Sequence, residues 1–183
     1  MRTRTLLSLA LVSLLAAPLS AQNVMVGGEA MYPTKDIVSN AVNSKDHTTL
    51  VAAVKAAGLV STLQGKGPFT VFAPINGAFA VLPAGTVDNL LKPENKAALT
   101  GVLTYHVVAG RMTAHDIMHA IKKGRGTAVL TTVNGQRLTA MMNGPRNIVL
   151  KDASGGVSNI STYDVLQSNG VIHVIDHVLL PKM

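Results

Sequence analysis

Apolar residues in the first half of the chain recur at the spacing of an α-helix. Leu50, Val54 and Ala57 fall on one side of a helix that Gly58 would end. Asp36 is placed to cap a shorter helix that precedes it. The first half is therefore predicted to be mainly helical.

Two further helices are indicated by the residues at their ends. Pro93 lacks only an N–H that would be unpaired in a first helical turn, so a helix is expected to run from there towards Tyr105. Thr113 and Asp116 have the spacing of a capping box, in which each side chain bonds to the other residue's backbone N–H. Gly124 would end the helix that begins there.

In the second half the apolar residues follow the pattern of strands. Residues 127–133 and 136–142 flank an Asn-Gly pair, which tolerates the positive φ of a tight hairpin turn. Residues 147–151 and 171–175 are predicted as further strands, and 69–73 as a buried strand nearer the N-terminus. Helices followed by meandering strands predict an α+β fold, antiparallel where hairpins connect the strands.

Residues 1–21 have the features of a signal peptide. Two arginines precede an apolar run over residues 6–17, and a small residue is available for cleavage before Gln22. The run is too short to cross about 30 Å of hydrocarbon, and no later segment is long enough. We therefore expect a secreted protein, periplasmic or extracellular, with no transmembrane anchor. Residues 22–35 would be a flexible lead-in and 36–183 one folded domain.

Composition narrows the possible functions. The 183 residues suit one domain, and 48% hydrophobic residues exclude wholesale disorder. The chain contains no cysteine, which excludes disulfides, thiolate metal sites and a cysteine nucleophile.

Positive charge is concentrated in residues 111–151, which carry seven basic residues against one acid. Such a stretch attracts acidic polysaccharide, anionic lipid or nucleic acid. Nucleic acid fits poorly, because stacking platforms need aromatic residues and the protein is expected to be exported. A solvated surface is the simpler alternative to a binding site. The candidate glycan- or anion-binding residues are Arg111, Lys122, Lys123 and Arg125.

Three blocks of sequence resemble the fasciclin family. They read FTVFAPINGAF from residue 69, LTYHVVAG from residue 103 and SNGVIHVID from residue 168, in the family's order and spacing. Ile75 and Gly77 depart from the pattern, which usually has a hydroxyl and a longer polar or acidic residue there. The chain resembles a single-domain, secreted bacterial fasciclin protein over roughly residues 36–181.

The resemblance implies an α+β fold, a compact fasciclin-like β-sandwich wedge with helices packed around it. Asn76 would cap a helix directly after the first strand. The resemblance also implies adhesion and protein–protein contact, with a cell-surface or matrix protein as partner and no general catalytic activity. We therefore expect a non-catalytic interaction module, with charge-led binding of acidic polysaccharide or lipid as the alternative.

The resemblance further suggests where a partner binds. Integrin recognition in animal matrix members has been placed near the tyrosine–histidine block and on Asp-Ile dipeptides. The corresponding residues here are Tyr105, His106, Asp116 and Ile117. The alternative for Tyr105 and His106 is a structural role, because amphipathic side chains are often buried with one hydrogen bond.

Two histidine pairs raise the question of a metal site. His115 and His119 are four residues apart in a predicted helix, so both could face one ion, but no third ligand is indicated. His173 and His177 lie on a strand, where four residues span about 13 Å. The chain also lacks a Gly-x-Ser-x-Gly motif. A zinc-dependent hydrolase is the least favoured function, and no catalytic residue, metal or cofactor is predicted.

Overall fold

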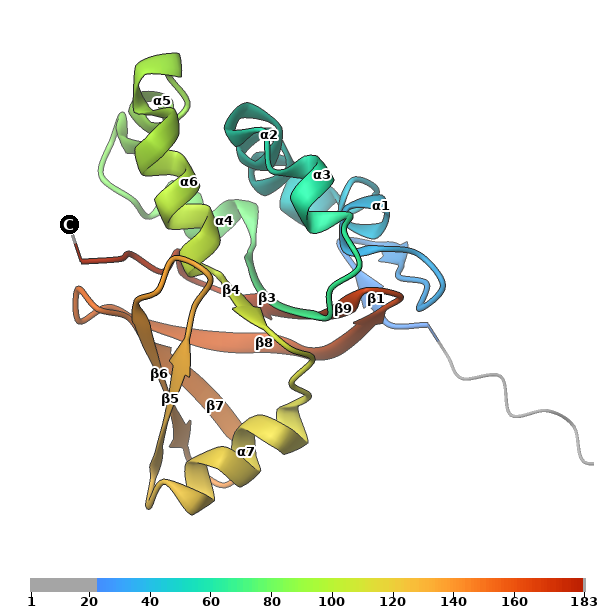
Figure 1. Cartoon of the computed structure of the whole chain (residues 1–183), viewed down its shortest axis with the longest axis vertical. Helices are drawn as coiled ribbons and strands as arrows, with labels where there is room; N and C mark the ends of the chain where they lie inside the picture. The colour runs from blue at the N-terminus through green and yellow to red at the C-terminus, as the bar shows by residue number, and fades with distance from the viewer. Residues whose placement is uncertain (1–22, 183) are drawn as a thin grey trace, which may run out of the picture.

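A computed structural model describes residues 23–182, and the predicted signal peptide lies outside this range. Its helices follow the chain as Figure 1 shows, with short 3-10 turns at Lys45–His47 and Pro93–Asn95. They are α1 (Ile37–Ala41), α2 (Thr48–Ala57), α3 (Val60–Leu63), α4 (Asn76–Ala80), α5 (Thr86–Leu90), α6 (Lys96–Tyr105) and α7 (Ala114–Lys123).

The strands form a small hairpin and one large sheet. They are β1 (Met25–Val26), β2 (Glu29–Ala30), β3 (Phe69–Pro74), β4 (Val107–Ala109), β5 (Thr127–Thr131), β6 (Arg137–Asn143), β7 (Asn147–Lys151), β8 (Val157–Gln167) and β9 (Gly170–Ile175). The large sheet has the order β4-β3-β9-β8-β7-β6-β5, antiparallel except for the parallel pair of β3 and β9. An isolated bridge between Val108 and Thr132 brings its two ends together.

Two apolar clusters hold the helices to the sheet. The first lies between α1, α2, α6 and strands β3 and β9, and includes Leu50, Leu103 and Ile172. The second lies between α7 and strands β5 to β7, and includes Ile117 and Leu138. Figure 1 shows α1, α2, α3 and α6 above the sheet and α7 at its lower end. The structure confirms the predicted α+β wedge with helices around it.

The helix ends form largely where the sequence predicts them. Asp36 accepts a hydrogen bond from Ser39 N–H at 2.9 Å and so caps α1. Gly58 ends α2 in the left-handed conformation, with a φ of 73°. Thr113 and Asp116 form the reciprocal capping box of α7. These predictions succeed because each depends on residues a few positions apart.

The role predicted for Asn76 is wrong. Ile75 occupies the cap position of α4 and its side chain makes no capping bond. Asn76 instead accepts a hydrogen bond from Thr49 N–H at 3.0 Å and donates one to the Lys45 carbonyl oxygen at 2.8 Å. Its side chain therefore joins α4 to the start of α2, a use that local sequence does not reveal.

The segment expected to be a flexible lead-in contains ordered structure. Strands β1 and β2 pair with each other, and Met31 N–H donates to the Val24 carbonyl oxygen at 2.9 Å. Val26 and Met31 are buried in the first apolar cluster. The boundary at residue 36 therefore cuts through the packed structure, because these two apolar side chains contribute to the core.

Among residues 23–182, none of the helices combines the length and the apolar character that crossing a membrane requires.

Candidate functional site

The residue pair Tyr105 and His106 lies in the core. The Tyr105 side chain is fully buried, and its hydroxyl donates to the Arg137 carbonyl oxygen at 2.9 Å. The same hydroxyl accepts a hydrogen bond from Ala153 N–H at 2.9 Å. Tyr105 therefore joins the end of α6 to β6 and to the turn after β7, and it is not available at the surface.

His106 is held by hydrogen bonds on both ring nitrogens. Nδ1 donates to the Val102 carbonyl oxygen at 2.8 Å, and Nε2 accepts from Leu179 N–H at 2.9 Å. Burial lowers the pKa of His106 to about 4, since the low-dielectric core disfavours the charged ring. The neutral ring connects α6 to the C-terminal segment, as in the structural alternative.

Asp116 and Ile117 occupy adjacent positions on α7 with opposite exposure. Ile117 is fully buried in the second apolar cluster. Asp116 is exposed, and hydrogen bonds from Thr113 lower the pKa of its carboxyl group. Three of the four residues suggested for partner contact are thus buried, because they sit on the inward faces of their elements, and the fourth caps a helix.

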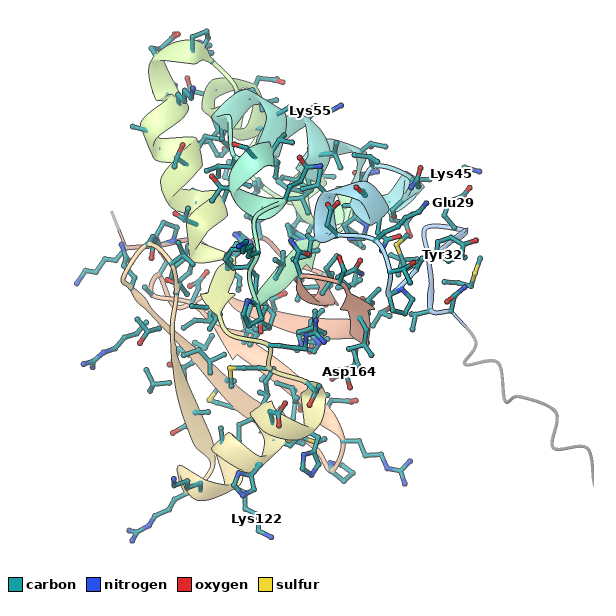
Figure 2. All side chains as sticks on the ribbon, turned by 45° about the vertical axis from the view of Figure 1, so that its right-hand side comes forward. Glu29, Tyr32, Lys45, Lys55, Lys122 and Asp164 are labelled. Carbon is teal, nitrogen blue, oxygen red and sulfur yellow. The ribbon has the colours of Figure 1, made fainter. Side chains whose placement is uncertain are left out.

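The candidate anion-binding residues are exposed but do not form one group. Lys122 and Lys123 end α7 and Arg125 follows, and Figure 2 shows Lys122 projecting into solvent. Arg111 lies apart from them, and its guanidinium donates to the carbonyl oxygens of Gln167 at 2.9 Å and Ser168 at 3.3 Å. None of these four cations forms an ion pair within the part of the chain that the structure describes.

An open groove runs between the two ends of the sheet. It has a volume of about 890 Å³, with Val108 and Met112 on one side and strand β5 on the other. Ala120 and Lys123 of α7 also line it. We call it the β5 groove. It could not be predicted from the sequence, because it depends on two segments that meet only in the fold.

Strand β5 presents unpaired backbone to this groove. Thr132 N–H donates to the Gln136 carbonyl oxygen at 3.0 Å. In an antiparallel pair of strands, the backbone groups of alternate residues face the neighbouring strand. The N–H and carbonyl of Leu130 therefore face β6 as well, and those of Val129 face away from it. Val133 N–H donates to the Val107 carbonyl oxygen at 2.7 Å, which joins β5 to β4 at one end. Within residues 23–182, the backbone groups of Val129 have no hydrogen-bond partner, and its side chain is 58% exposed.

The histidines do not converge on a metal site. His115 and His119 are exposed on α7, and nowhere in the described chain do three or more potential ligands group around a possible ion. His173 is buried, with Nε2 donating to the Met112 carbonyl oxygen at 2.9 Å and Nδ1 accepting from Asp164 N–H at 3.3 Å. Burial lowers the pKa of His173, so its ring serves as a neutral link between backbone segments.

Comparison with known proteins places the chain in a family. A model of the Fasciclin domain matches residues 45–181. Protein sll1483 of Synechocystis sp. is 44% identical over 162 residues, which cover 88% of this chain and 82% of that protein. Immunogenic protein MPT70 of Mycobacterium tuberculosis is 37% identical over 146 residues, 77% of this chain and 66% of the other.

Two longer proteins match over part of their length. Transforming growth factor-beta-induced protein ig-h3 of Sus scrofa is 37% identical over 134 residues, which are 73% of this chain and 17% of that one. The solved FAS1 domain pair of the insect cell adhesion molecule Fasciclin I superposes with a TM-score of 0.70 at 18% identity, covering 80% of this chain and 51% of the other. The chain is therefore a member of the fasciclin domain family.

Proposed function

We propose that this protein is a secreted, non-catalytic adhesion module that binds a cell-surface or matrix protein through the β5 groove. Its family includes a cell adhesion molecule and a mycobacterial cell surface glycolipoprotein, which support a role outside the cytoplasm. The hydrogen bonds that occupy both nitrogens of His106 and His173 favour packing over catalysis.

The unpaired edge of β5 is the observation that carries the proposal. An extended segment of a partner can hydrogen-bond to such an edge and continue the sheet. Val129 offers its backbone N–H and carbonyl for this pairing, and its exposed side chain offers apolar contact. Lys123 lines the same groove and Arg125 follows α7, so the bound segment would carry acidic residues.

Proximity labelling of the exported protein in its native cells tests the proposal. Val129→Pro removes the outward N–H without disturbing the ladder to β6, since proline is tolerated on an edge strand. Val129→Thr is the matched control, because it keeps the N–H. We expect Val129→Thr to label the wild-type set of proteins and Val129→Pro to lose one or more of them. Identical labelling by all three proteins would refute the β5 groove as the contact surface.

A second candidate function is charge-led attachment to acidic polysaccharide or lipid. It is favoured by the exposed Lys122, Lys123 and Arg125, which lack carboxylate partners among the described residues. Binding of this kind weakens steeply with salt, because exposed charges are screened.

Heparin chromatography tests this second candidate. Changing Lys122, Lys123 and Arg125 to Glu should abolish salt-sensitive retention. Changing the exposed Lys45, Lys66 and Lys92 to Glu alters net charge equally and should leave most of it. Equal loss in both triple variants would show that only net charge matters and would remove the candidate site.

A further inference from the structure

A second hollow lies among the helices and strands of the first apolar cluster. It has a volume of about 200 Å³ and is lined by residues of α1, α2, α3 and α6 and of strands β3, β4 and β9. We call it the helix cavity. Leu50, Val54, Leu103 and Ile172 are among the residues that line it.

The wall of the helix cavity is almost entirely apolar. Of its 17 lining residues, Lys55 and His106 alone carry polar side chains. Both nitrogens of His106 are already bonded to backbone groups, at 2.8 and 2.9 Å. A buried water needs two to four polar partners, which this wall does not supply. The helix cavity is therefore suited to an apolar group and not to ordered water.

The cavity reaches the surface between α1 and α2. Two of its lining residues, Val42 and Lys55, are exposed, and Figure 2 shows Lys55 projecting from α2 at the opposite end of the molecule from Lys122. Lys55 forms no ion pair with any described residue, and no carboxylate lines the cavity. Lys55 is thus the one cationic side chain that the described residues place along the wall of an otherwise apolar cavity, and it is long enough to turn towards a bound anion.

We propose that the helix cavity binds a medium-chain fatty acid, with its tail inside and its carboxylate at the Lys55 ammonium group. The size sets the chain length: an apolar cavity of about 150 Å³ takes benzene, with six carbons, so about 200 Å³ takes roughly eight. A decanoate tail fills this volume and leaves its first carbons at the mouth. The fatty acid also restores dispersion contacts that the wall residues lack in the empty cavity.

Calorimetric titration of the full chain with decanoate tests the proposal. We expect one decanoate per molecule, with a negative heat-capacity change from the buried tail. Acetate, which has no tail, should not bind. Decylammonium, which has the same tail and the opposite charge, should bind at least fivefold more weakly. Equal binding of decanoate and decylammonium, or no saturable binding of decanoate, would overturn the proposal.

Two variants locate the bound tail and head. Ala41→Leu extends a side chain into the cavity and should weaken decanoate binding at least tenfold, whereas Ala52→Leu, on the exposed face of α2, should not. Lys55→Gln should reduce the preference for decanoate over decylammonium, and Lys45→Gln, away from the cavity, should preserve it. Unchanged binding by Ala41→Leu would place the ligand elsewhere.

A measurement on the wild-type protein decides the matter if Ala41→Leu does not fold. Decanoate should shift the NMR methyl signals of Leu50 and Val54, which line the cavity, and leave those of Leu138 and Ile148 in the second cluster unchanged. Uniform shifts or none would refute the site.

Discussion

At the scale of single residues, buried polar side chains connect segments that lie far apart in the sequence. Tyr105 bonds to Arg137 and Ala153, and His106 bonds to Leu179. Each partner is more than thirty residues away, so the sequence can indicate that these side chains need a polar contact but not where it is. For this reason the sequence left partner binding and a structural role as open alternatives.

Replacing Tyr105 by Phe should lower the free energy of unfolding by about 2 kcal/mol. The change removes a hydroxyl that satisfies two backbone groups, and a buried polar group left unpaired costs about 1–3 kcal/mol. Urea denaturation measures the loss. Tyr32→Phe, at an exposed tyrosine, should be neutral. Equal stability of Tyr105→Phe and wild type would contradict the hydrogen bonds assigned to this hydroxyl.

His106 should make the protein less stable in acid. Its pKa is about 4 in the folded state against an ordinary value of 6.5, so the unfolded chain binds the proton more readily. The contribution of the neutral His106 ring to the free energy of unfolding is therefore complete above pH 6.5 and is lost as the pH falls to about 4. The free energy of unfolding should decrease by about 3 kcal/mol over this range. His47 and His173, whose pKa values are also lowered by burial, act in the same direction.

Urea denaturation between pH 7 and pH 4 measures this dependence. His106→Gln should be less stable at pH 7 and should show a shallower pH dependence than wild type. His115→Gln, at an exposed position, should follow the wild-type curve. A curve for His106→Gln as steep as that of wild type would show that this ring does not titrate as the structure requires.

At the scale of elements, local signals predicted well and long-range pairings did not. The capping box of α7 and the hairpin of β5 and β6 depend on neighbouring residues, and both are confirmed. The parallel pairing of β3 with β9 joins residues about a hundred positions apart. Strand β8 was not predicted. Register shifts interrupt its pairing with β9, and Asp164 has a φ of 55°, so buried and exposed residues do not alternate regularly along it. The β5 groove and the helix cavity were missed because each requires several elements to be assembled.

Thr113→Ala should destabilise the protein by about 1 kcal/mol. The threonine hydroxyl accepts a hydrogen bond from Asp116 N–H at 3.3 Å, and loss of such a cap costs about this much. Hydrogen exchange should accelerate most in the first turn of α7. Thr62→Ala serves as the control, since that threonine is exposed in α3 and makes no side-chain hydrogen bond. Unchanged exchange in α7 would contradict the capping role.

At the scale of the whole molecule, one sheet passes through both apolar clusters. Strand β8 pairs with β9, which packs in the first apolar cluster, and with β7, which packs in the second. The two clusters are therefore joined by one continuous sheet. We therefore expect cooperative unfolding of the domain as a single unit.

Shortening one buried side chain in either cluster tests whether the domain unfolds as a single unit. Leu50→Ala in the first cluster and Leu138→Ala in the second should each lower the free energy of unfolding by about 3 kcal/mol. Each variant should still show one transition, with circular dichroism and tyrosine fluorescence changing together. Two separate transitions in either variant would mean that the clusters unfold independently.

The open edge of β5 has a consequence for copies of the protein in close proximity. Unpaired strand edges invite edge-to-edge aggregation, and proteins commonly protect them with charged side chains. Lys123 lines the groove beside this edge, and Lys122 and Arg125 are close to it in the chain, so two copies approaching through the edge bring like charges together. High ionic strength weakens that repulsion, and concentrated solutions of the protein should therefore stay monodisperse at low ionic strength and form oligomers at high ionic strength.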